Sequence, residues 1–173
     1  MKKYIILCLC VSACLLIAIV FAISGSFGVR KNHVEENARA EQNIDTAWEV
    51  SKSVNERIAA MIFYNEALDD YTFSIYIKRD GLSFGYHFSY GGSGSAIMEG
   101  VQRFSYGNKG FALISMNHSQ ISRIEVDNGV HVSSVVIDSE RPFALALPDD
   151  CGLVVLYDKY NNEVEITCTE DCT

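Results

Sequence analysis

Proline is scarce in this chain, and no tract of low complexity interrupts it. The 173 residues include two prolines, Pro142 and Pro148. Long disordered linkers are rich in proline and polar repeats, so this composition excludes such a linker. The triplets Gly-Lys-Ser and Gly-Lys-Thr are absent as well, which excludes a phosphate-binding loop of the P-loop type.

The glycine-rich stretch 91–95 lacks the patterns that would make it a chemical site. A nucleophile elbow needs glycine two places before and two places after a serine, but Ser93 has Gly91 before it and Ser95 after it. A dinucleotide fingerprint that begins at Gly92 would need glycine at position 97, where isoleucine stands. The stretch therefore predicts a flexible loop with no catalytic and no cofactor-binding residue.

Histidine is also infrequent, with four in the chain, and none stands at metal-ligand spacing from another histidine or a cysteine. No metal site is therefore predicted. His87 alternates with the apolar residues of its segment and is expected to face solvent or a groove. Serine and aspartate are common enough for a Ser-His-Asp set, but the sequence favours no particular set. We expect no enzyme, and an exported hydrolase remains an alternative.

Basic residues are outnumbered by acidic ones. Lys and Arg total 14 against 22 Asp and Glu, which gives a formal net charge of -8. Such a surface repels phosphate backbones, so nucleic acid is excluded as a partner. A basic protein or a cationic ligand remains permitted.

One long segment has no charge at all. Residues 4–23 are almost entirely apolar and follow Met1-Lys2-Lys3. At about 1.5 Å per residue, twenty helical residues match a hydrocarbon core of about 30 Å. The segment predicts a transmembrane signal anchor over 1–27 that contacts the lipid bilayer through 4–23. A juxtamembrane link over 28–33 and an extracytoplasmic domain over 34–173 would follow, with the N-terminus in the cytoplasm.

Two other fates remain open for this segment. Ala22 and Ser24 offer the small residues of a cleavage site, which would make the protein secreted. The run Val11-Ser12-Ala13-Cys14 resembles the lipobox of bacterial lipoproteins, and the resemblance implies a lipid anchor on Cys14. The apolar run that continues after Cys14 favours the retained anchor.

Outside the apolar segment the cysteines are odd in number: Cys151, Cys168 and Cys172. An odd number in an exported domain leaves at least one thiol unpaired within the chain. A disulfide could join Cys168 to Cys172 or Cys151 to Cys168, and free thiols are the alternative.

A helix is expected from residue 34 to residue 68. Thr46 followed by Glu49 fits a capping box. Apolar residues then recur at spacings of three and four, which is typical of one face of a helix: Ala47, Val50, Val54, Ile58, Met61 and Ile62. We expect this face to cover the core of the domain, with a coiled-coil stalk as the alternative.

After Asp70 the apolar period changes from three or four to two, which is typical of strands. Alternating runs over 71–78 and 82–90 flank Asp80-Gly81, a tight-turn pair. Further strands are expected at 111–116, 121–127, 130–138, 143–147, 153–158 and 163–167, with turns at Asn128-Gly129 and Asn161-Asn162. The predicted class is α+β, mainly β: an amphipathic helix packed on an antiparallel β-sandwich or curved sheet of about eight strands.

Nine tyrosines are the most distinctive part of the composition. Tyrosine presents a rigid face with a polar tip, so Tyr76, Tyr90 and Tyr106 are predicted to form a ligand-binding surface. Ordinary cross-strand packing would also favour aromatic residues here.

The predicted function is a membrane-anchored binding or interaction module whose partner is another protein or a surface ligand. Residues 157–163 resemble the terminal hairpin of bacterial surface β-sandwich modules, which implies the same kind of role. A component of a cell-envelope assembly that associates through the helix over 34–68 is the alternative. Asn117-His118-Ser119 also matches an N-glycosylation acceptor.

Overall fold

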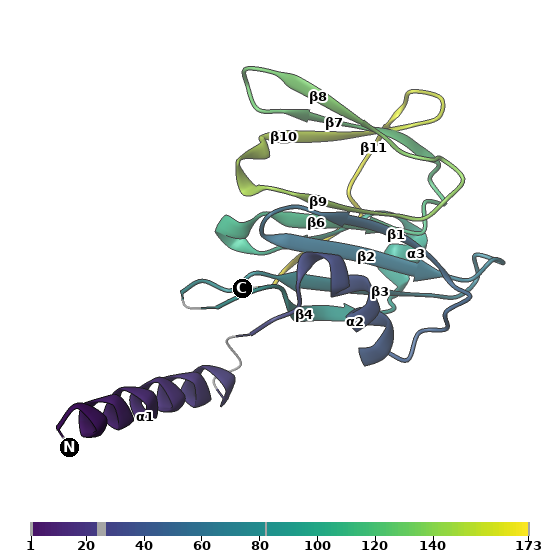
Figure 1. Cartoon of the computed structure of the whole chain (residues 1–173). Helices are drawn as coiled ribbons and strands as arrows, with labels where there is room; N and C mark the ends of the chain where they lie inside the picture. The colour runs from purple at the N-terminus through teal and green to yellow at the C-terminus, as the bar shows by residue number, and fades with distance from the viewer. Residues whose placement is uncertain (1, 24–26, 82, 173) are drawn as a thin grey trace.

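The chain folds into three stacked β-sheets with a short helix against the first (Figure 1). The computed structural model describes residues 2–23, 27–81 and 83–172, and in helix α1 (Lys2–Ile23) it describes the side chains of residues 10–20. Twelve strands in three four-stranded sheets account for most of this part of the chain. The predicted α+β class, with a transmembrane helix and about eight strands, is therefore wrong: the protein is mainly β.

The first sheet, called here the helix-side sheet, is an antiparallel meander. Its strands, in spatial order, are β1 (Glu49–Val54), β2 (Ile58–Tyr64), β3 (Tyr71–Ile77) and β4 (His87–Gly92). Helix α2 (Val34–Glu41) lies on its outer face, where Val34 and Ala38 are buried. All seven residues of β2 are buried, because its alternate side chains face α2 and the second sheet.

The predicted helix over 34–68 is wrong beyond α2, because the segment from 49 to 64 forms β1 and β2. A run that is apolar on every residue fits a doubly buried strand as well as a helix. The chain turns between the two strands at Asn55, whose Oδ1 accepts hydrogen bonds from the backbone N–H groups of Arg57 and Ile58, both at 2.8 Å. No helical stripe is therefore available for a coiled-coil stalk.

The second sheet, the central sheet, has the order β12-β5-β6-β9. It contains β5 (Gln102–Ser105), β6 (Phe111–Ser115), β9 (Phe143–Leu147) and β12 (Cys168–Asp171), with β12 parallel to β5. The third sheet, the distal sheet, has the order β11-β10-β7-β8. It contains β7 (Ile121–Asp127), β8 (Val132–Val136), β10 (Leu153–Asp158) and β11 (Glu163–Val164).

The remaining regular elements are short. Helix α3 spans Ser95–Glu99, and single 3-10 turns occupy Lys31–His33, Gly107–Lys109 and Asp149–Cys151. Gly91 and Gly92 belong to β4 and Ser95 begins α3, so the stretch predicted as a flexible loop is largely regular.

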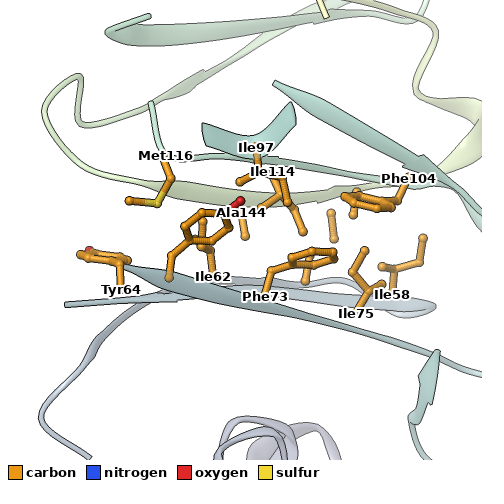
Figure 2. Packing of buried hydrophobic residues seen from close by; sticks show 14 of the residues in the cluster. Ile58, Ile62, Tyr64, Phe73, Ile75, Ile97, Phe104, Ile114, Met116 and Ala144 are labelled. Carbon is orange, nitrogen blue, oxygen red and sulfur yellow. The ribbon is translucent and has the colours of Figure 1, made fainter. Parts of the chain in front are cut away.

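The central sheet is buried on both faces. In β6, Ala112 and Ile114 join the core shared with the helix-side sheet, whereas Phe111 and Leu113 join the core shared with the distal sheet. Figure 2 shows the first of these cores, where Ile62 and Phe73 point toward Ile114 and its neighbours from the facing sheet. Continuous apolar strands are expected where both faces of a sheet are covered.

Several strands and turns agree with the sequence patterns. The predicted strands at 143–147 and 153–158 coincide with β9 and β10. Gly129 and Asn161 adopt the positive φ angles that tight turns require, +81° and +68°. These local predictions hold because turn residues and alternation act over few residues.

The prediction of a membrane anchor needs correction. Within the described residues, no helix has the length and apolar character needed to cross a bilayer. The described side chains of α1 cover residues 10–20, which at about 1.5 Å per residue is about half of a 30 Å hydrocarbon core. The rest of the predicted span, 4–9 and 21–23, lies outside the described side chains. The transmembrane anchor and the single-pass localisation are thus contradicted.

Candidate functional site

The three tyrosines predicted as a ligand surface lie in different environments. Tyr76 is buried beneath α2, and its hydroxyl donates a hydrogen bond to Asn37 Oδ1 at 2.8 Å. Burial raises the pKa of Tyr76 to about 12. Tyr106 is buried in the core between the helix-side and central sheets, and this burial raises its pKa as well. Tyr90 alone of the three is exposed, so they do not form one surface.

A β-bulge separates the aromatic side chains of β4 onto two faces. The register pairs Ile75 with Tyr90 but Tyr76 with Phe88, so one extra residue, Ser89, sits in β4. Tyr90 consequently lies on the face of the central sheet and Phe88 on the face of α2. The strict alternation expected over 82–90 ends at this bulge.

Four aromatic rings remain exposed along this side of the helix-side sheet. Phe84 is 55% exposed, Phe88 47% and Tyr90 38%, and Phe27 lies against Phe84 with the ring centroids 5.8 Å apart. We call Phe84, Phe88 and Tyr90 the aromatic edge. Phe88 and Tyr90 belong to β4, and Phe84 lies just before it. β4 is the last strand of its sheet (Figure 1).

Buried rings hold two members of the aromatic edge in place. Tyr76 meets Phe88 edge to face with the centroids 5.6 Å apart. Tyr90 contacts Phe73 at 5.9 Å and Phe104 at 5.5 Å between centroids. Aromatic pairs at such separations stabilise one another beyond simple burial, so these contacts favour the observed positions of Phe88 and Tyr90.

The hydroxyl of Tyr90 has polar neighbours, whereas its ring packs against apolar side chains. The carboxylate of Glu170 lies beside the hydroxyl and raises the pKa of Tyr90. Glu170 also accepts a hydrogen bond from the Gln102 side chain at 3.1 Å. A cavity of about 110 Å³ opens here between the helix-side and central sheets. Small-molecule sites usually measure roughly 300–1,000 Å³, so this one suits a single side chain.

A larger cleft of about 540 Å³ lies at another position, between the β1–β2 turn and two 3-10 turns. Its lining is mostly polar and charged: Asn55, Glu56, Arg57, Asn108, Lys109, Pro148, Asp149 and Asp150. Its two cations already pair with Asp80, Lys109 at 2.8 Å and Arg57 at 3.8 Å. The hydrogen bond from Lys109 lowers the pKa of Asp80. Because both cations of the cleft are already paired with Asp80, neither is left free to bind an anionic ligand.

His87, which was predicted to face solvent or a groove, is buried and therefore does not face solvent, and its Nε2 lies 2.7 Å from Ser83 Oγ. Desolvation, with a smaller contribution from Arg79, lowers the pKa of His87. A hydrolytic dyad needs a third group that orients the imidazole. Among the described residues, no carboxylate bonds the His87 ring. The geometry therefore shows a Ser-His contact without the rest of a triad.

The cysteines Cys151, Cys168 and Cys172 are free thiols. Cys168 and Cys172 are four residues apart along extended chain, so their Cα atoms are separated by about 13 Å, whereas a disulfide needs roughly 4.4–6.8 Å. Cys151 is the buried last residue of the 3-10 turn that follows β9, and desolvation raises its pKa. A raised pKa keeps this thiol protonated and unreactive.

Asn117 does not offer a glycosylation site, because its side chain is enclosed. The amide nitrogen donates to the carbonyl oxygens of Ile121 at 3.1 Å, Asp138 at 2.9 Å and Arg141 at 3.1 Å. Its Oδ1 accepts from the backbone N–H of Ile121 at 2.7 Å. The side chain is a structural junction between β6, β7 and the segment before β9.

Comparison with known proteins adds no functional assignment: no family model, curated protein or solved structure matches this chain. The candidate site is therefore judged on its geometry. Phe84 and Phe88 were missed by sequence reasoning, which predicted a ligand surface of Tyr76, Tyr90 and Tyr106. The available signal was glycine inside a strand pattern, at Gly85 and Gly91, which often marks a bulge or a close backbone approach.

Proposed function

We propose that this chain is a binding module that holds a protein partner on its aromatic edge. The observation that supports the proposal is that one edge strand exposes the aromatic rings of Phe88 and Tyr90, which pack against buried rings. Large exposed apolar groups of this kind mark interaction sites, and tyrosine is enriched among the residues that dominate binding energy.

Size and charge favour a protein over other ligands. The cavity next to Tyr90 holds about 110 Å³, too little for a typical small-molecule site. A net charge of -8 disfavours nucleic acid. A partner would insert an apolar side chain beside Tyr90 and cover Phe88 from the other side of the strand.

The test uses peptides selected from a display library on the full chain. Their affinities would be measured by fluorescence anisotropy for wild type, Phe88→Ser, Tyr90→Ser and a control, Tyr160→Ser. Tyr160 is an exposed tyrosine in the turn between β10 and β11, far along the chain from the aromatic edge. Loss of one aromatic anchor costs about 2 kcal/mol, which is roughly a 30-fold weaker affinity.

We expect this loss of affinity for Phe88→Ser and Tyr90→Ser and none for Tyr160→Ser. The two edge variants should unfold at a lower temperature, because each loses a contact with a buried ring, but all three variants should remain folded at the temperature of the assay. Peptides that bind the edge variants as tightly as wild type would refute the proposed surface. The alternative of assembly through a helix over 34–68 has lost its structural basis, since its residues Val54 and Ile58 lie in β1 and β2.

A further inference from the structure

β8 (Val132–Val136) ends the distal sheet, and one side of it has no neighbouring strand. Its sequence, Val-Ser-Ser-Val-Val, contains no charge, no proline and no bulge. Natural edge strands usually carry such features because a free edge can pair with another chain. β8 carries none of them.

The hydrogen-bond register identifies the backbone groups that face outward. Ile137 N–H donates to Ser122 O at 2.9 Å, and Asn128 N–H donates to His131 O at 3.4 Å. In an antiparallel ladder, hydrogen-bonded and non-hydrogen-bonded pairs alternate. The residues of β8 whose N–H and C=O groups point away from β7 are therefore Val132, Ser134 and Val136.

The same three residues are exposed and symmetric in sequence about Ser134. Val132 is 53% and Val136 83% exposed. If two such strands meet antiparallel about Ser134, Val132 of each copy faces Val136 of the other, and the two Ser134 residues face each other. Every outward N–H then meets an outward C=O, which gives six backbone hydrogen bonds in a self-complementary interface of two-fold symmetry.

We propose that β8 pairs edge to edge with β8 of a second copy of this chain, which joins two distal sheets into one eight-stranded sheet. The charge distribution permits a second copy to bind here. The chain has a net charge of -8, but residues 128–137 contain no Asp, Glu, Lys or Arg. A second copy therefore meets no like charge along the paired strands. This inference is independent of the aromatic edge, which lies on a different sheet.

The area of contact sets the strength of the pairing. Five residues from each strand bury less than the roughly 1,200–2,000 Å² of a standard stable interface. The dimer is consequently weak and reversible, with a dissociation constant of about micromolar or above.

Sedimentation equilibrium of the full chain over a hundredfold concentration range tests the proposal. Ser134→Pro removes an outward N–H and no bond of the distal sheet, because proline is tolerated at such edge positions. We expect the dissociation constant to rise at least tenfold for Ser134→Pro and to stay within threefold for the control Ser134→Thr. Thermal unfolding of both variants should match wild type.

A pair of charge variants tests the register itself. Residues 132 and 136 of one chain are about 13 Å apart, too far to pair with each other, but the proposed dimer brings 132 of one copy to 136 of the other. Val132→Lys should weaken association, Val132→Lys with Val136→Lys should abolish it, and Val132→Lys with Val136→Glu should restore it. A wild type that stays monomeric would overturn the proposal and leave the edge to a strand of another protein. Association that survives Ser134→Pro and the double lysine variant would place it on another surface, α1 included, and overturn it equally.

Discussion

Asn117 is the residue at which a single substitution should cost most, because one side chain satisfies four backbone groups. It is 3% exposed, its Oδ1 accepts one hydrogen bond, and the two hydrogens of its Nδ2 are shared among the carbonyl oxygens of Ile121, Asp138 and Arg141. These contacts amount to about three full hydrogen bonds, and each costs about 0.5–1.5 kcal/mol net when it is lost, so together they cost about 3 kcal/mol. The backbone of Asn117 also has φ +62°, where alanine costs about 1 kcal/mol more.

We therefore expect Asn117→Ala to lower the free energy of unfolding by about 4 kcal/mol and Asn117→Gly by about 3 kcal/mol. With an m-value near 2 kcal/mol/M in urea, the midpoint of unfolding by Asn117→Ala falls by about 2 M. Urea titration followed by circular dichroism measures both quantities. A midpoint within about 0.3 M of wild type would refute the assignment of Asn117 as a junction.

Asn117→Asp provides a variant of the same shape. Its carboxylate would face three carbonyl oxygens in a buried site, which raises its pKa in the folded state. A group whose folded pKa lies above its unfolded value loses stability as pH rises through the folded pKa. The deficit of Asn117→Asp relative to wild type should be larger at about pH 8 than at about pH 4.5. An equal deficit at both pH values would show that the side chain is not enclosed.

Two further predictions concern the side of the molecule near β4. Burial lowers the folded pKa of His87, so the unfolded chain binds a proton first as pH falls below about 6.5, and stability should decline from there downward. Urea titrations at several pH values should show a smaller decline in stability for His87→Gln. The control His131→Gln, at an exposed histidine, should leave the decline unchanged. If His87→Gln does not alter the decline, the lowered pKa of His87 is contradicted. Gly85 has φ +83°, and a Cβ there would lie 2.7 Å from the carbonyl oxygen of Val29. Gly85→Ala should lower the free energy of unfolding by about 2–3 kcal/mol. Gly81→Ala should lower it by about 1 kcal/mol, because φ there is +82° but no atom outside the neighbouring residues lies within 4 Å of the added Cβ. Equal losses would show that the contact with Val29 does not matter.

The parts of the fold that the sequence predicts are those set by local chemistry. Asn128-Gly129 and Asn161-Asn162 mark their turns because few residues adopt positive φ at low cost. The strand at 153–158 follows from its short apolar run between a glycine and a turn. Such signals need no knowledge of what packs on either face.

The parts that fail depend on neighbours distant in the chain. Ile58 to Tyr64 is apolar throughout because α2 and the central sheet cover its two faces, and a run of this kind has no period to separate strand from helix. The bulge at Ser89 puts Phe88 and Tyr90 on opposite faces of the sheet, whereas the alternation expected over 82–90 puts them on the same face. Tyr76 was predicted to be exposed because the sequence does not show that α2 covers it.

The sequence predicted the type of candidate site, an aromatic contact surface, but not all of the residues that form it. Abundant tyrosine indicated an aromatic contact surface, and Tyr90 is exposed as expected. The exposure of Phe88 follows from the position of β4 at the end of its sheet, which depends on strand order rather than on composition.

The central claim of this account is that the middle sheet is buried on both faces, and two adjacent residues test it directly. Leu113 and Ile114 are both fully buried, but they point into different cores. Each substitution to alanine should lower the free energy of unfolding by about 2–4 kcal/mol, measured by urea titration. If either Leu113→Ala or Ile114→Ala costs less than about 0.5 kcal/mol, that face is open to solvent and the three-sheet stack is contradicted.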